Sequence, residues 1–134
     1  FFKQEILIES EAKGDLKSKE YIDALAKTLA FRKTITDLLF TFKLDALSGI
    51  TNGPACCIDL VNGDYGNGPS LSTPAAITGF PHITVPMGLV HGLPVGISFY
   101  GQAYSEPALI AMAFSYEQAS LRRKKPVFQK DLLG

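Results

Sequence analysis

The sequence predicts an α/β chain in which helical regions flank a run of short strands and turns. Apolar residues recur at helical spacing in the first third of the chain and again near its end. Between these regions, 41 consecutive residues (65–105) carry no Asp, Glu, Lys or Arg. Seven glycines and five prolines interrupt this run, so it cannot supply the ~20 unbroken apolar residues of a membrane span. We therefore predict strands buried on both faces, which a chain of 134 residues would hold only as the interior of a larger protein.

The composition excludes several classes of protein. The 13 basic and 13 acidic residues cancel, which argues against binding to nucleic acid or an anionic membrane by bulk electrostatics. No basic segment followed by an apolar one opens the chain, so no secretory signal is expected, and Phe1 in place of methionine suggests an excised piece. Cys56 and Cys57 are adjacent and such neighbours rarely pair, which excludes a disulfide framework and favours a reducing compartment. We predict a cytoplasmic protein.

Residues 1–43 are predicted to be helical. A first helix over 1–12 ends before Gly14, and Ser18 is a suitable N-cap for a second one. Two apolar stripes follow, formed by Ile22, Leu25, Ala26 and Leu29 and by Ile35, Leu38, Leu39 and Phe42. The six-residue step between the stripes predicts a bend near Arg32 and Lys33.

Residues 44–71 are predicted as a strand and a loop. The strand covers 44–50 and ends in the turn signal Asn52-Gly53-Pro54. Residues 59–70 are rich in Asn, Gly, Asp and Pro, which is typical of a loop.

A short helix comes next and opens a third unit, 72–101. Ser72 or Thr73 can cap this helix, Pro74 suits its first position, and Gly79 suits a left-handed residue at its end.

The same unit then forms a hairpin. A strand over 82–85 is expected to stop at Pro86 and Gly88, and a second strand covers 95–100. The short connection between these strands favours an antiparallel pair.

The last predicted element is a helix over 105–125. Ser105 is its expected cap, and Pro126 its terminator. The basic run 122–125 would complement the helix dipole. Leu109, Met112, Ala113, Tyr116 and Ser120 are expected to face inward.

The residues alone give little support to metal, triad or redox chemistry. His82 and His91 lie far from the cysteines in the sequence, so no metal site is expected. A triad of Ser72, His82 and Asp64 is conceivable, although Ser72 lies in no Gly-x-Ser-x-Gly turn. The cysteines could form a redox pair, but two small apolar side chains at a buried strand end are the favoured interpretation. The run 122–125 is expected to be a solvated helix end, and no cofactor is predicted.

Two stretches resemble a known family. They are STPAAITGFPHITVPMG at 72–88 and GLPVGISFYG at 92–101. Ser105-Glu106, a helix bearing Glu117-Gln118, and the upstream segments LDAL at 44–47 and NGPA at 52–55 fit the same pattern. Over about residues 20–126, the chain is similar to the C-terminal part of the amidase signature family. That family includes peptide amidases, fatty-acid amide hydrolases and the glutamyl-tRNA amidotransferase component that carries the amidase activity.

The resemblance implies an α/β fold with a large mixed sheet flanked by helices, and hydrolysis of an amide through an acyl-serine. The family's catalytic lysine and two serines lie upstream of the matching part, and no Gly-Gly-Ser-Ser-Gly-like segment occurs in this chain. No catalytic position is therefore carried over, and the chain is predicted to be inactive alone, as one C-terminal segment (1–134) of a larger amidase domain.

The family resemblance also bears on substrate binding. The amidotransferase branch has an acidic residue where Pro69 stands, which favours a stand-alone amidase. A second departure is Ile50-Thr51, where the family often has a Pro-Thr pair. Ser70 and Ser72 are the candidate substrate-binding residues, as a pocket wall, with helix capping by Ser72 as the alternative.

The expected partners are a small amide substrate and the missing N-terminal part of the same protein, with self-association of the isolated segment and without nucleic acid or membrane. The alternative function is a non-catalytic structural or interaction module derived from the amidase fold.

Overall fold

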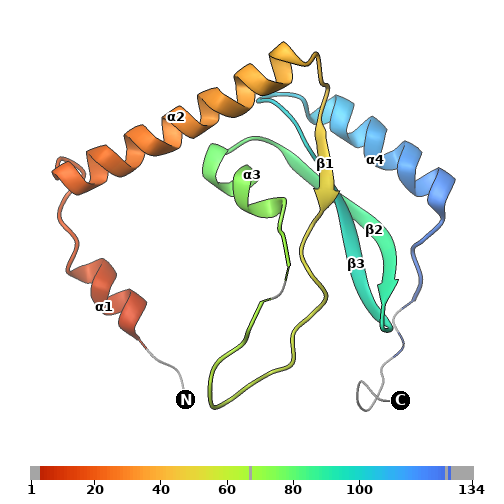
Figure 1. Cartoon of the computed structure of the whole chain (residues 1–134), viewed down its shortest axis with the longest axis horizontal. Helices are drawn as coiled ribbons and strands as arrows, with labels where there is room; N and C mark the ends of the chain where they lie inside the picture. The colour runs from red at the N-terminus through yellow and green to blue at the C-terminus, as the bar shows by residue number, and fades with distance from the viewer. Residues whose placement is uncertain (1–3, 67, 126, 128–134) are drawn as a thin grey trace.

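The structure is a computed structural model and describes residues 4–66, 68–125 and 127. Helices and a small sheet alternate along this part of the chain, which confirms the α/β class (Figure 1). The elements are α1 (Glu5–Glu11), α2 (Lys19–Thr41), β1 (Leu47–Ile50), α3 (Ser72–Thr78), β2 (His82–Val90), β3 (Leu93–Tyr100) and α4 (Glu106–Ser120).

The sheet separates the helices into two layers. Its strand order is β1-β3-β2 and both pairings are antiparallel, so β3 is the central strand. Tyr100 and Ser98 of β3 point to the face that α2 and α3 cover, because the Tyr100 hydroxyl hydrogen-bonds Thr78 of α3. Phe99 points to the opposite face and meets Tyr116 of α4 edge to face. We call the face that carries Ser98 and the Tyr100 hydroxyl the polar face of the sheet, and the face that carries Phe99 the apolar face.

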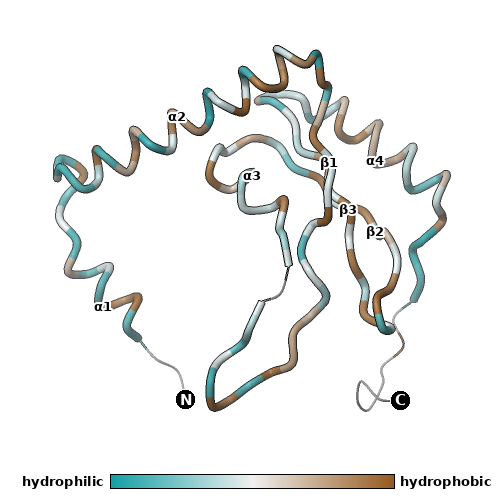
Figure 2. Tube along the Cα trace, in the orientation of Figure 1, coloured by the Kyte–Doolittle hydropathy of each residue, from teal (hydrophilic) through white to brown (hydrophobic). Residues whose placement is uncertain are grey.

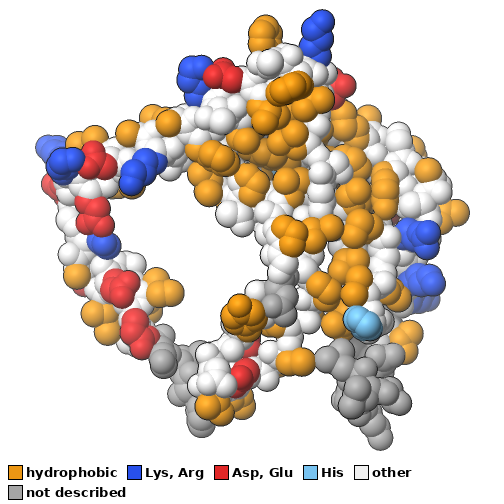
Figure 3. Space-filling view, in the orientation of Figure 1, with side chains coloured by type: hydrophobic (Ala, Val, Ile, Leu, Met, Phe, Trp, Pro, Cys, Tyr) orange, Lys and Arg blue, Asp and Glu red, His pale blue; other side chains and the backbone are white. Residues whose placement is uncertain are grey.

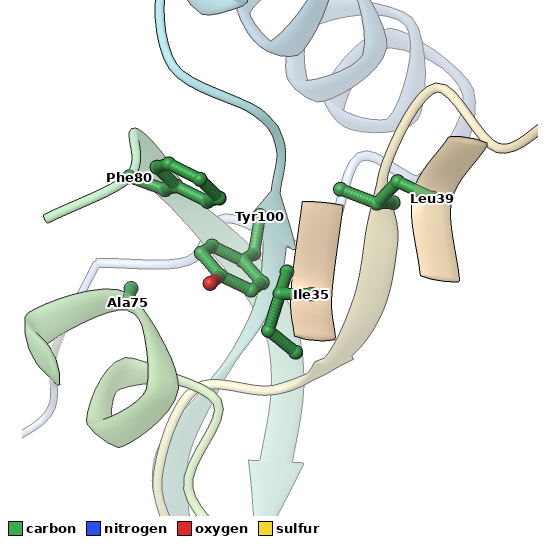
Figure 4. Close-up of a cluster of buried hydrophobic side chains, with 5 residues drawn as sticks. All are labelled: Ile35, Leu39, Ala75, Phe80 and Tyr100. Carbon is green, nitrogen blue, oxygen red and sulfur yellow. The ribbon is translucent and has the colours of Figure 1, made fainter. Parts of the chain in front are cut away.

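The core lies where α2, α3 and β3 meet (Figure 4). Tyr100 and Leu39 are fully buried there, and Arg32 places its guanidinium 4.9 Å from the centre of the Phe80 ring. The buried cluster comprises Ile35, Leu39, Ala75, Phe80 and Tyr100. It is small for a chain of this length, which is why much of the apolar surface remains exposed.

The hairpin of β2 and β3 is confirmed as antiparallel, but the predicted end of its first strand is wrong. β2 continues past Pro86 and Gly88 to Val90. A bulge between Pro86 and Gly88 absorbs one extra residue, and β2 is an edge strand, where a proline leaves no ladder bond broken. His91 and Gly92 make the turn with positive φ at both positions, as a two-residue hairpin requires.

Helix α2 begins as predicted, because the Ser18 side chain accepts a hydrogen bond from the Tyr21 N–H. The bend expected near Arg32 and Lys33 is absent, and the helix is continuous to Thr41. At about 100° per residue, the two apolar stripes are centred about 140° apart around the helix axis. Only the second stripe reaches the core, so the change of face requires no kink.

The first half of α2 and helix α1 extend away from the sheet (Figure 1). Neither contains a buried residue, although apolar positions recur along both (Figure 2). We call this part, residues 5–30, the arm. Helix α1 confirms most of the helix expected over 1–12. Residues 1–3 of that prediction lie outside the residues that the structure describes.

The cap predictions for the other two helices have mixed outcomes. Helix α3 begins at Ser72 itself, so its N-cap is Leu71 and neither Ser72 nor Thr73 caps it through a side chain, which makes that prediction wrong. Ser105 is the N-cap residue of α4 as predicted, but its hydroxyl donates to the Gln102 carbonyl instead of accepting from an N–H of the helix. Gly79 does follow α3 in the left-handed conformation, with φ of 66°.

Helix α4 is shorter than predicted. It ends at Ser120, and Leu121 takes a left-handed conformation, so the basic run 122–125 is not helical. Four adjacent positive charges would repel one another on a helix surface, which opposes its extension. Pro126, the expected terminator, lies outside the described residues. Leu109 and Ala113 are buried as predicted.

Apolar side chains are exposed over much of the visible face (Figure 3). They occur on the arm, at the loop before α3 and on the outer side of α4, and include Ile6, Ile8, Leu25, Leu29, Ile58, Val61, Ile110 and Phe114. In the part of the chain that the structure describes, no helix combines the length and the apolar character that a membrane span needs.

Candidate functional site

Ser70 and Ser72, the predicted pocket-wall residues, lie together beside the end of β1. Their hydroxyl oxygens are 2.6 Å apart, and both residues are half-buried. Ser70 donates to the Thr51 carbonyl at 3.1 Å, and the Ser72 hydroxyl lies 3.4 Å from the Asn52 side-chain oxygen. The Leu71 N–H donates to the Ile50 carbonyl, which holds the segment against the strand. The loop is therefore docked onto the sheet at this point.

A second group of hydroxyls continues from Thr51 across the polar face of the sheet. The Thr51 hydroxyl lies 2.5 Å from that of Thr84 on β2 and 2.7 Å from that of Ser98 on β3. Ser98 is completely buried, whereas Thr84 is exposed. The two threonines converge over Gly96, where an added Cβ would lie 2.7 Å from both hydroxyl oxygens. Glycine is the residue that leaves room for this arrangement.

We call the connected residues Thr51, Asn52, Ser70, Ser72, Thr84 and Ser98 the hydroxyl strip. Thr51 joins its two halves, one through its side chain and one through its carbonyl. No residue of the strip is ionisable, in keeping with the charge-free run. Thr51, Thr84 and Ser98 were not among the predicted site residues. For Thr84 and Ser98 a signal was present, because small polar residues alternate with Ile83, Val85, Ile97 and Phe99 and therefore share one face of the hairpin. For Thr51 there was none.

The conceivable triad of Ser72, His82 and Asp64 is not formed. Ser72 is bonded within the strip, and the Asp64 carboxylate accepts from the Asp59 backbone N–H. The His82 Nε2 atom is buried and has no hydrogen-bond partner among the described residues. Burial holds the pKa of His82 below its usual range. Its Nε2 atom bonds neither Ser72 nor another described residue, so the imidazole is not placed as the base of a serine nucleophile.

The cysteine interpretation is also corrected. Cys56 and Cys57 are free and exposed in the loop after β1, not buried at a strand end. The described residues contain no group of three or more His, Cys, Asp or Glu side chains that could hold a metal ion. Asp59 lies in the same loop, and its pKa is lowered because the Asn62 and Val61 backbone N–H groups and the Asn62 amide bond its carboxylate.

A shallow depression lies elsewhere, beside the C-terminal end of α2. It is lined by Leu39, Phe40, Thr41, Lys43, Leu44, Asp45 and Gln102, and so shares no residue with the hydroxyl strip. The predicted pair Ser70 and Ser72 is therefore brought together at the end of β1, away from this depression.

Comparison with known proteins gives the chain relatives along nearly its whole length. No protein-family model matches it. It is 36% identical over 126 residues to a "Probable amidase" of Arabidopsis thaliana, a match that covers 93% of this chain and 21% of that protein. It is 49% identical over 49 residues to a component of the glutamyl-tRNA(Gln) amidotransferase of Rubrobacter xylanophilus, covering 37% of this chain and 10% of that protein.

A solved structure is also similar to nearly the whole chain. A peptide amidase, crystallised with the competitive inhibitor chymostatin, matches with a TM-score of 0.83 and 42% sequence identity, over 95% of this chain and 26% of that one. The chain thus spans only about a fifth to a quarter of the length of these relatives. Sequence and structure together show that the chain belongs to the amidase signature family, as a segment of the amidase fold.

Proposed function

We propose that the whole protein is a hydrolase of carbon–nitrogen bonds that cleaves an amide through an acyl-serine intermediate. The observation that carries the proposal is the match to amidases along 93% of the chain. The family's catalytic lysine and serines have no counterparts in this sequence, so the 134-residue chain supplies structure and a binding surface but no nucleophile. The other residues of the protein would supply the chemistry.

Within that protein, residues 1–134 form one C-terminal segment of the amidase domain, and Ser70 and Ser72 form part of the substrate pocket wall. The mutual hydrogen bond of their hydroxyls and the docking of Leu71 on β1 support this role, because a wall must be held in place. The Ser72 side chain can form part of the wall because it makes no capping bond to α3.

The partners follow from the same account. The substrate is a small amide, and the arm and the loop before α3 pack against the missing N-terminal part of the protein. Exposed apolar residues on both support this, as do relatives four to five times longer than the chain. When isolated, the segment self-associates through these surfaces. A cytoplasmic location is consistent with two unpaired cysteines.

Release of ammonia or amine from simple carboxamides by the whole protein tests the function. We expect turnover, and a covalent acyl adduct visible by intact-protein mass spectrometry when an ester substrate is used. Ser72→Ala should raise KM more than it lowers kcat, because it removes a wall contact and not the nucleophile. A whole protein that hydrolyses no carboxamide and forms no adduct would instead be the non-catalytic module.

A further inference from the structure

Cys56 and Cys57 are nucleophilic side chains to which the proposed function gives no role. Both thiols are free, and both residues are exposed in the loop between β1 and α3. Neither residue makes a backbone hydrogen bond within the described part of the chain. Because no ladder fixes the backbone at this point, the two neighbouring side chains can turn toward each other, and a small molecule can reach both sulfurs.

Adjacent cysteines are poorly suited to a disulfide with each other. The described peptide bonds are all trans. Consecutive Cα atoms across a trans peptide lie about 3.8 Å apart, whereas most disulfides join Cα atoms separated by roughly 4.4–6.8 Å. An S–S bond between Cys56 and Cys57 would therefore be strained, and strained disulfides are easily reduced. In a reducing medium the pair persists as two thiols.

The surroundings of the pair supply no third ligand for a metal ion. A structural zinc ion takes four ligands, and the residues that the structure describes contain no group of three or more His, Cys, Asp or Glu side chains that could share an ion. Asp59 is the nearest acidic residue in the sequence, and its carboxylate already accepts hydrogen bonds from the Val61 and Asn62 backbone N–H groups and the Asn62 amide. The pair suits a thiophilic centre that needs two sulfurs and no more.

We propose that Cys56 and Cys57 of this chain form a binding site for monosubstituted trivalent arsenicals, R–As(OH)₂. Each thiol replaces one hydroxyl: two As–O bonds break, two As–S bonds form, and the two thiol protons leave with the hydroxyls as two molecules of water. Arsenic stays trivalent, so no oxidant or reductant is consumed. The arsenic atom separates the sulfurs further than an S–S bond would, which relieves the strain that opposes a disulfide between neighbours. The site does not depend on amide hydrolysis.

Two sulfurs hold the arsenic much more tightly than one sulfur does. Once the first As–S bond has formed, the second thiol of the pair reacts within the same molecule, which raises the overall affinity by about 10²–10⁴-fold. A competing monothiol such as glutathione has no such advantage. It should displace the arsenical easily from a single cysteine and with difficulty from the pair.

Competition with glutathione tests the proposal. Phenylarsine oxide, which hydrates to a molecule of this class, is added to the reduced 134-residue chain, and the adduct is followed by intact-protein mass spectrometry as glutathione is added. We expect one phenylarsenic group per chain and the loss of both free thiols. Cys56→Ser and Cys57→Ser should each release the group at a glutathione concentration at least about a hundredfold lower.

A matched control keeps two exposed thiols but separates them. Cys56→Ser combined with Ser115→Cys moves one thiol to α4, far from the loop (Figure 1), and should release the group as easily as the single variants do. Retention equal to the parent's by this variant or by either single variant would overturn the proposal. One arsenic atom linking two copies of the chain, or no adduct on the parent, would overturn it as well.

Discussion

Gly79 shows how a single residue ends an element in this chain. Its φ of 66° lies in the left-handed region, and an added Cβ there would meet no atom within 4 Å. Any cost of substitution is therefore backbone strain and not a clash. We expect Gly79→Val to lower the free energy of unfolding by about 1 kcal/mol or more.

Two controls separate strain from other effects. Gly79→Asn should cost less, because asparagine tolerates the left-handed region. Gly66→Val, at a glycine with open space and no positive φ, should leave thermal stability nearly unchanged. Equal melting temperatures for Gly79→Val and the parent would show that the left-handed ending of α3 is wrong.

His82 gives the chain a pH-dependent stability. Burial lowers the pKa of its imidazole below the ordinary value of 6.5, so the unfolded chain binds this proton more tightly than the folded one. The contribution is fully present above the unfolded pKa and is lost as the pH falls through that value toward the lower folded pKa. The parent should therefore lose more stability than His82→Gln on acidification from about pH 8 to about pH 5.5. An equal fall in melting temperature for the parent and His82→Gln between the two pH values would contradict this.

At the scale of elements, α2 consists of two halves in different environments. Leu39 in its second half is completely buried, whereas Leu25 in its first half is 43% exposed. Leu39→Ala should cost about 2–5 kcal/mol of unfolding free energy, because it leaves a cavity beside Tyr100. Leu25→Ala, the same chemical change on the same helix, should cost less than about 0.5 kcal/mol. Denaturant unfolding of the two variants measures both, and similar losses would mean that the arm is packed in solution.

The elements show which patterns in the sequence determine structure by themselves. Helical spacing, the Ser18 cap and the glycine after α3 are local signals, and each of them predicted the structure correctly. The length of β2 was not predictable in this way. Pro86 and Gly88 end a strand or make a bulge depending on whether the strand lies at an edge, and that is decided by pairing with β3. The prediction of a bend in α2 was wrong for a similar reason. Two apolar stripes on different sides of a helix imply a kink only if both stripes pack on the same surface.

The hydroxyl strip shows the same limit for the site. The resemblance to amidases led to Ser70 and Ser72, which are two residues apart in the sequence. Thr51, Thr84 and Ser98 come from three separate parts of the chain, and only the register of β2 and β3 and the backbone bond of Thr51 to Gly96 bring them together. No local pattern contains that information.

At the scale of the whole molecule, apolar faces are exposed on the arm, and among the described residues β1 and β2 are edge strands with no further strand beside them. We expect the isolated chain to self-associate, which light scattering would show as a molar mass above that of the 14.5 kDa monomer. Leu25→Glu combined with Leu29→Glu should reduce the association, because these leucines lie on one stripe of the arm. Ala24→Glu, about 120° away from these leucines around the helix axis, should not. A monomer at high concentration would show that the segment is self-sufficient.

This chain is a segment of the amidase fold, and its sequence contains none of the family's reacting groups. The most direct measurement is ammonia release from primary carboxamides by the purified 134-residue chain, assayed beside the whole protein. Our account predicts turnover by the whole protein and none by the chain, since no acyl-serine can form without the upstream lysine and serines. Turnover by the chain alone that Ser72→Ala abolishes would contradict it, and would place the nucleophile within these residues.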